Sequence, residues 1–272
     1  MKDKIIRTLL FFTSRPVFFK FFYYTNKICL YAMNRTSAAF LKPEFSGEKE
    51  SLEWILKNLD SKNNLTVFDC GGNIGEYADL IFNVSDKLKA NIQLHVFEPS
   101  QLCIEKLIEK FGGFKNVWIH KNAVSNSSGS ATLYYPWVGS PGASLSSDVS
   151  IAQRTGLYET QSEQVSLITL DNFCHENNIE HIDYLKLDIE GYEIQALQGA
   201  NEMLNKGKIS YIQVEIGAAS LVTKCMLFDI WNMLALTYNF YLVLNHGLIK
   251  IDEYKPDLEC FHGASNFILE LK

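Results

Sequence analysis

The sequence lacks the features of extended and membrane-spanning proteins. Only 6 of its 272 residues are proline and 16 are glycine, which excludes a collagen-like or low-complexity array. No apolar run reaches the roughly 20 residues that a transmembrane helix needs. Apolar residues make up 47% of the chain and charged residues 21%, as in an average globular protein. The composition therefore predicts a folded domain with a full hydrophobic core.

Closely spaced cysteines are also missing. No two of the six cysteines lie within 25 residues of each other, so neither a CxxC pair nor a zinc-ribbon spacing occurs. We find no other ligand spacing and expect no metal. The apolar stretch after Arg7 is short and no small-residue cleavage site follows it, so a signal peptide is not indicated. Isolated cysteines without a signal peptide are typical of reduced thiols, so we expect a cytoplasmic protein.

Positive charge is scarce outside the N-terminal segment. Residues 1–42 hold eight Lys or Arg and one Asp, a net charge of +7. The whole chain carries −6, so the remaining 230 residues carry −13. A nucleic-acid partner is not expected, because phosphate contacts need clustered cations.

The N-terminal segment, residues 1–46, is apolar, aromatic and basic, and it precedes the predicted domain of residues 47–272. Pro16 predicts a break between two helices at Arg15. Two interpretations remain for residues 1–42. The segment lies on an anionic membrane surface, as a peripheral contact on the inner face of the membrane, or its helices pack on the domain or on a second subunit in a homo-oligomer.

From residue 65 the pattern alternates between short β-rich runs and helical spacing, which predicts βαβ units and a mostly parallel sheet with helices on both faces. The last strands are joined by a hairpin-like HGLI, which favours an antiparallel end to the sheet. The expected strands are 65–70, 92–98, 117–124, 131–135, 182–188, 209–215, 240–245 and 266–271. The expected helices are 48–59, 75–89, 100–111, 170–177, 191–205 and 220–238.

Residues 136–165 are rich in Ser and Gly and weakly periodic. A loop this long inside a domain is usually a lid or a binding loop, and we favour the lid. Tyr134, Tyr135 and Trp137 precede it or open it, and a sugar ring would stack on such side chains. Ordinary packing of these aromatic side chains is the stronger interpretation.

A glycine-rich turn follows the first strand. The run from Asp69 to Gly75 reads DCGGNIG, between a strand and a helix. Glycine permits close approach of a ligand to the backbone, and the helix N-terminus offers free N–H groups. Asn73 and Glu76 stand where the dinucleotide fingerprint GxGxxG requires glycine, which argues against an NAD-dependent dehydrogenase, and no GK[ST] follows for a P-loop. A ligand-binding turn or a plain strand–helix turn remains.

Acidic residues end several of the other strands. Glu98 follows the second strand and precedes Pro99, where an acid accepts both hydroxyls of a ribose. Asp188 ends the strand expected beside the first one, and Glu215 ends the next. Four acids including Asp69 repel each other unless something cationic is bound there. S-adenosylmethionine, with a ribose diol, an ammonium and a positive sulfur, fits this set.

Five blocks of the chain closely resemble the FkbM family of S-adenosylmethionine-dependent methyltransferases, over about residues 65–215. They are TVFDCGGNIGEYADL, HVFEPS, NAVSNSSGSATLY, LITLDNF and IDYLKLDIEGYEIQALQGA. The resemblance implies a Rossmann-like, seven-stranded class I methyltransferase sheet in an α/β fold. It also implies methyl transfer to a hydroxyl oxygen, with a glycan sugar or a small natural product as acceptor.

The resemblance also implies residue roles, carried over by position. Asp188 and Glu190 face the reacting methyl group, and Asp188 is our first choice as general base. His246 and His262, in C-terminal loops, are alternative bases. A non-catalytic adenosine-binding or assembly module with the same fold is the alternative function. The residues expected at the cofactor are Asp69, Gly71, Gly72, Asn73, Gly75, Glu98, Pro99, Asn122, Ala123 and Asp188.

Overall fold

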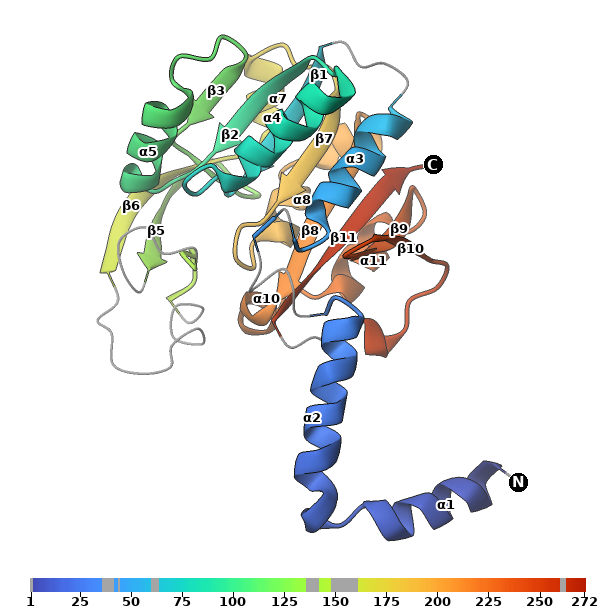
Figure 1. Cartoon of the computed structure of the whole chain (residues 1–272). Helices are drawn as coiled ribbons and strands as arrows, with labels where there is room; N and C mark the ends of the chain where they lie inside the picture. Colours follow the sequence, from blue (N-terminus) through green and yellow to red (C-terminus); the bar gives the residue numbers. More distant parts are fainter. Residues whose placement is uncertain are drawn as a thin grey trace.

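The computed structural model describes residues 2–35, 42–43, 45–59, 64–135, 142–147, 161–259 and 263–272. They form an α/β domain with two helices extending from it at the N-terminus (Figure 1). The α-helices are α1 (Lys2–Thr13), α2 (Pro16–Ala32), α3 (Glu48–Asn58), α4 (Glu76–Leu88), α5 (Gln101–Phe111), α7 (Leu170–Glu176), α8 (Glu193–Gln198), α9 (Asn201–Asn205), α10 (Ala218–Thr223) and α11 (Leu227–Leu234). A short 3-10 helix, η2, covers Pro256–Glu259.

Eight strands form the main sheet, in the order β10-β9-β11-β8-β7-β1-β2-β3. The stretch from β8 to β3 is parallel, whereas β11 runs antiparallel to both of its neighbours and β10 pairs antiparallel with β9. These strands are β1 (Leu65–Cys70), β2 (Ile92–Phe97), β3 (Val117–His120), β7 (Ile182–Leu187), β8 (Ile209–Gly217), β9 (Tyr238–Leu244), β10 (Gly247–Ile251) and β11 (Ala264–Leu271). The predicted antiparallel end of the sheet is confirmed.

The predicted number of seven strands is wrong by one. The hairpin after Leu244 continues into β10, which pairs with β9 from Gly247 to Ile251. This strand lies at the sheet edge and most of it is half-buried or exposed, so its pattern lacks the apolar run of the central strands. The sequence therefore indicated a hairpin connection there, and a strand formed.

Three short strands form a second sheet in the order β4-β6-β5, from β4 (Ala123–Val124), β5 (Gly129–Tyr135) and β6 (Gln161–Ile168). The predicted strand 117–124 is therefore divided between two sheets. Residues 161–165 of the predicted lid belong to β6, and most of the remainder of 136–165 lies outside the described residues. No sequence signal separated β6 from the loop before it.

Two predicted helices are each broken in two. The helix predicted over 191–205 is interrupted at Gly199, whose Cβ position would lie 2.1 Å from the backbone oxygen of Ser125. The chain after β4 therefore passes too close for any larger residue. The helix predicted over 220–238 becomes α10 and α11, with Lys224 in the left-handed conformation between them.

The central strands are buried on both faces of the sheet, as a parallel sheet covered by helices requires. In β1, Val67 packs into the core beneath α3, α4 and α5, whereas Phe68 packs into the core beneath α7, α8, α9 and α11. Helices therefore cover both faces, as predicted (Figure 1). This layered arrangement brings the carboxyl ends of β1, β2, β3 and β7 to one edge of the sheet.

Candidate functional site

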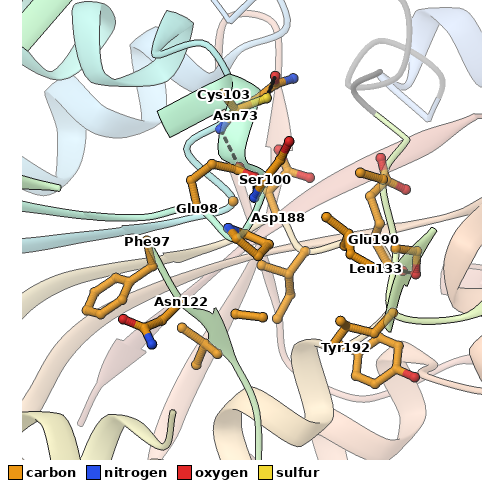
Figure 2. A pocket seen from close by; sticks show the side chains of 18 of the residues that line it. Asn73, Phe97, Glu98, Ser100, Cys103, Asn122, Leu133, Asp188, Glu190 and Tyr192 are labelled. Atoms are coloured by element: carbon orange, nitrogen blue, oxygen red, sulfur yellow. Dashed lines mark hydrogen bonds between the residues drawn. The ribbon is translucent and has the colours of Figure 1, made fainter. Parts of the chain in front are cut away.

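A pocket opens at this carboxyl edge, where ligands bind in open α/β sheets. Figure 2 shows Glu98 and Asn122 on one side of it, with Glu190 and Tyr192 on the opposite side. The pocket is lined by Gly71, Asn73, Phe97, Glu98, Pro99, Ser100, Cys103, Asn122, Ala123, Val124, Leu133, Tyr135, Ala143, Ser144, Leu145, Asp188, Ile189, Glu190 and Tyr192. Of these described lining residues, three are acidic and none is basic.

The turn after β1 is packed directly against the turn after β7. Gly71 has a φ of +89°, and a Cβ there would lie 1.9 Å from the carbonyl oxygen of Asp188. The backbone N–H of Asp188 donates to the carbonyl of Cys70 at 3.1 Å. Position 71 therefore needs glycine, both for its left-handed backbone and for the close contact with Asp188. Asp188 is brought to the glycine turn by backbone contact between neighbouring strands.

Glu98 is held by two backbone N–H groups. Its Oε2 accepts from the N–H of Asn73 at 2.8 Å, and its Oε1 accepts from the N–H of Ser100 at 2.8 Å. The side chain is buried, and burial raises its pKa to about 7, although the two N–H groups oppose this shift. Each carboxylate oxygen keeps a second lone pair, so Glu98 can accept further hydrogen bonds from a ligand.

Asp188 lies partly exposed in the pocket and is paired with a buried lysine. Lys186 Nζ donates to Asp188 Oδ2 at 3.0 Å and lies 3.6 Å from Asp69 Oδ1. The ammonium also lies over the ring of Tyr77, 4.7 Å from its centroid. Burial by itself lowers the pKa of Lys186, but the adjacent Asp188 and Asp69 raise it above its ordinary value. Lys186 thus offsets part of the negative charge of Asp188 and Asp69.

A polar network continues from this ion pair beneath the pocket. Tyr77 and Tyr184 share a hydrogen bond of 2.5 Å between their hydroxyl groups, and Tyr184 donates to Gln213 Oε1 at 2.8 Å. Gln213 Nε2 in turn donates to Glu48 Oε1 at 2.9 Å. Burial raises the pKa of Glu48. The start of α3 is therefore hydrogen-bonded to the centre of the sheet.

The loop after β7 is shaped by a buried carboxylate. Glu193 Oε1 accepts from the N–H groups of Ile189 at 3.1 Å and Gly191 at 3.2 Å. Burial raises the pKa of Glu193 to about 7. Glu190 takes a φ of +52°, and its carbonyl accepts from the Ser144 hydroxyl at 2.9 Å. Glu193 thus acts on the site by fixing the backbone that carries Asp188 and Glu190.

The structure brings most of the sequence-predicted site residues together. Those that line the pocket are Gly71, Asn73, Glu98, Pro99, Asn122, Ala123, Asp188 and Glu190. Three others do not line it: Asp69 is completely buried beside Lys186, and Gly72 and Gly75 face packed side chains. The roles of all these residues in catalysis and cofactor binding stay predictions.

The other candidates for chemistry lie elsewhere. His246 is exposed at the turn between β9 and β10, and it is not among the pocket residues. Glu215 lies two residues before the end of β8 and also does not line the pocket; burial, then Asp188 and Glu190, raise its pKa. His262 and Trp137 fall outside the described residues.

Several pocket residues were not identified from the sequence. Cys103, Ser144 and Tyr192 reach the pocket from α5, from the segment 142–147 and from the turn after β7. None carries a spacing that marks it, because each is brought in by packing. Lys186 stands two residues before Asp188, and this alternation on one strand was the available signal for an ion pair.

Neither a metal cluster nor a membrane span emerges from the described part of the chain. Within it, no group of three or more His, Cys, Asp or Glu side chains is placed to hold a metal ion. None of its helices combines the length and the hydropathy needed to cross a bilayer.

Comparison with known proteins gives a family match. The model of the methyltransferase FkbM domain matches residues 69–241, well over half of the 272 residues. None of the curated proteins compared with the chain matches it.

Solved structures show weaker likenesses. The N-methyltransferase NodS from Bradyrhizobium japonicum WM9 is 7% identical, with a TM-score of 0.37, over 84% of this chain and 97% of that one. A SAM-dependent methyltransferase from Leishmania major is 10% identical, with a TM-score of 0.36, over 84% of this chain and 72% of that one. Likenesses of this size say nothing about substrate, so the assignment rests on the family match. The chain belongs to the FkbM methyltransferase family.

Proposed function

We propose that the protein is an S-adenosylmethionine-dependent O-methyltransferase that acts on a hydroxyl group of a glycan sugar or a small natural product. The observation that carries the proposal is the charge of the pocket: Glu98, Asp188 and Glu190 line it, no described lining residue is basic, and the buried Lys186 offsets only part of the charge of Asp188 and Asp69. Such a pocket attracts a cationic ligand and repels a pyrophosphate. This supports a sulfonium cofactor over a nicotinamide dinucleotide.

The lining residues suit the parts of this cofactor. Glu98 would accept hydrogen bonds from the ribose diol, as its two oriented oxygens allow. The apolar side chains of Val124 and Leu133, with Ala123 and the amide of Asn122, form a wall suited to an adenine ring. When bound, the cofactor supplies an electrophilic methyl group.

Asp188 is our candidate for the general base. A sugar hydroxyl is a poor nucleophile at neutral pH, so a carboxylate that accepts its proton would accelerate the reaction by roughly 10²–10⁴-fold. Lys186 orients the carboxylate of Asp188 while leaving the side chain partly exposed to the pocket. Positioning of the acceptor would contribute a further part of the rate. A neutral acceptor agrees with the absence of basic side chains among the described lining residues.

The test is Asp188→Asn, with the exposed Asp252→Asn as control. We expect the first variant to bind S-adenosylhomocysteine in calorimetry but to lose turnover by at least about 10²-fold. The control should keep both. Full turnover of Asp188→Asn would remove Asp188 from this role. Failure of the wild-type protein to bind S-adenosylmethionine or S-adenosylhomocysteine would instead favour a non-catalytic module with the same fold.

A further inference from the structure

The N-terminal helices carry a large apolar surface that the domain does not cover. We name α1 and α2, residues 2–32, the arm; in Figure 1 α2 extends away from the domain and α1 turns off at its far end. The apolar side chains of α2 that stand exposed are between 42% and 76% accessible. They are Val17, Phe18, Phe19, Phe21, Phe22, Tyr23, Tyr24, Ile28 and Tyr31. Contiguous apolar surface of this kind marks an interaction site.

The side chains of α2 are sorted around the helix as at a lipid interface. Lys20 and Lys27 are two helical turns apart and therefore share one side. Tyr23, Tyr24 and Tyr31 each lie three or four residues from one of these lysines, so the tyrosines flank the charged side. Ammonium groups and tyrosine hydroxyls are the groups that stay in the headgroup layer while apolar parts sink below it.

The opposite side of α2 holds only apolar rings and small side chains. Phe18, Phe21, Phe22 and Cys29 follow each other at spacings of one and two turns, and all are exposed. In α1, Ile5, Ile6, Leu9 and Leu10 likewise form a stripe. Lys4 and Arg7 are one turn from each other on the other side, which they share with Phe11, whereas Lys2 lies at the N-terminal end of the stripe. Apolar and basic side chains are thus clearly separated around α2 and only partly separated around α1.

The charge of the arm selects an anionic surface. Residues 2–32 contain six Lys or Arg and a single acid, Asp3. Two arms packed against each other would bring these like charges together, whereas anionic headgroups attract them at every position. Charge and apolar surface together favour a lipid surface over a second copy of the chain.

The arm joins the domain at the edge where the pocket opens. Asn34 Nδ2 donates to the carbonyl oxygens of Ser46 at 2.7 Å and Val243 at 3.1 Å, close to the end of β9. Since β11 is antiparallel to both β8 and β9, the latter two run in the same direction. The end of β9 is therefore on the carboxyl edge of the sheet. A membrane that holds the arm would lie on the pocket side of the domain (Figure 1).

We propose that the arm docks the protein on an anionic lipid bilayer and turns the pocket toward it, so that the acceptor is a hydroxyl group held at the membrane surface. The docking stands on the arm alone; the class of acceptor rests on the proposed function. Ser46 connects the arm to the domain, because its carbonyl accepts a hydrogen bond from Asn34 and its hydroxyl donates one to Glu48 Oε2 at 2.6 Å. Glu48 then joins the polar network beneath the pocket.

The first experiment is vesicle flotation of the full chain. We expect binding to phosphatidylglycerol-rich vesicles, weak binding to phosphatidylcholine vesicles, and a fall in binding as salt increases. A variant with five arm charges removed should lose about 10³-fold in partitioning, at roughly fivefold per charge. Its substitutions to Gln are at Lys4, Arg7, Arg15, Lys20 and Lys27. The matched control carries five exposed body lysines changed to Gln, at Lys106, Lys115, Lys208, Lys250 and Lys255.

Each result either supports or overturns the docking. The control should float as the wild type does, and a triple change of Phe18, Phe21 and Phe22 to Ser should lower binding while the charges remain. Equal flotation of the arm-charge variant and the wild type would overturn the proposal. The proposal would also be overturned if the protein forms a dimer in solution that does not bind anionic vesicles and that dissociates when the arm is changed. The arm would then be a subunit contact. Retained S-adenosylhomocysteine binding in the arm variants separates a failed arm from a failed cofactor site.

The second experiment tests the orientation by backbone hydrogen exchange. With anionic vesicles present, we expect slower exchange in the segment around Lys224, which follows β8 at the carboxyl edge. The segment around Lys208 precedes β8 at the opposite edge and should be unchanged. Protection at Lys208 in place of Lys224 would refute the inferred direction of the pocket.

Discussion

Replacing Glu98 by Gln separates the cost of a buried carboxylate from its use in ligand binding. Burial raises the pKa of Glu98 from 4.5 to about 7 in the folded protein. A carboxyl group whose pKa is raised on folding stabilises the fold while it is protonated. That stability is lost as pH rises from the unfolded pKa through the folded one. For these two values the loss between about pH 5 and about pH 8 is on the order of 2.5 kcal/mol.

The substitution should remove this loss. Gln has one acceptor oxygen, so either Asn73 or Ser100 would lose the partner of its N–H group, at about 1–3 kcal/mol and at every pH. We therefore expect Glu98→Gln to be less stable than the wild type near pH 5, with the difference shrinking by about 2.5 kcal/mol near pH 8. S-adenosylhomocysteine should bind the variant more weakly, and its affinity for the wild type should rise with pH as Glu98 ionises.

The assay is urea unfolding of both proteins at both pH values, with calorimetry for the ligand. Glu109→Gln, at an exposed position of α5, removes the same charge without touching the pocket and should follow the wild-type curve. Parallel stability curves for wild type and Glu98→Gln would refute the reasoning. Unchanged ligand affinity in Glu98→Gln would refute the assignment of Glu98 to the cofactor.

Further predictions concern the backbone and the charges around the pocket. Gly71→Ala forces a side chain into left-handed backbone against Asp188, so unfolding should cost about 2–4 kcal/mol less and S-adenosylhomocysteine binding should fail. Gly113→Ala, where a Cβ meets nothing within 4 Å, is the control for both measurements. Lys186→Met leaves Asp69 buried without its cation and should lower unfolding free energy by about 3–5 kcal/mol near pH 8. The loss should be smaller near pH 5 than near pH 8, because burial raises the pKa of Asp69. Adding Asp69→Asn should restore much of the lost stability, and an equal loss at both pH values would contradict this.

Much of the site could be predicted from the sequence, because its residues lie at the ends of strands. Gly71, Glu98 and Asp188 each follow a strand of strong apolar character, and parallel strands deliver their carboxyl ends to one edge. The contacts between those strand ends could not be predicted from the sequence. Asp69 was expected at the cofactor with the other acids, yet it is buried beneath the pocket, because its side chain alternates to the face where Lys186 lies.

The amino-acid sequence by itself determined the α/β class, the position of the glycine turn, the break before Pro16 and the family, since each depends on local pattern. Tertiary structure alone decided which acids share a pocket, that Lys186 pairs with Asp188, that β10 extends the sheet, and that the arm leaves from the pocket edge. The physical reason is distance along the chain. Periodicity and turn chemistry act within a few residues. The contacts of Asp69 with Lys186, of Asn34 with Val243 and of Glu48 with Gln213 each join residues more than a hundred positions apart, and packing selects them.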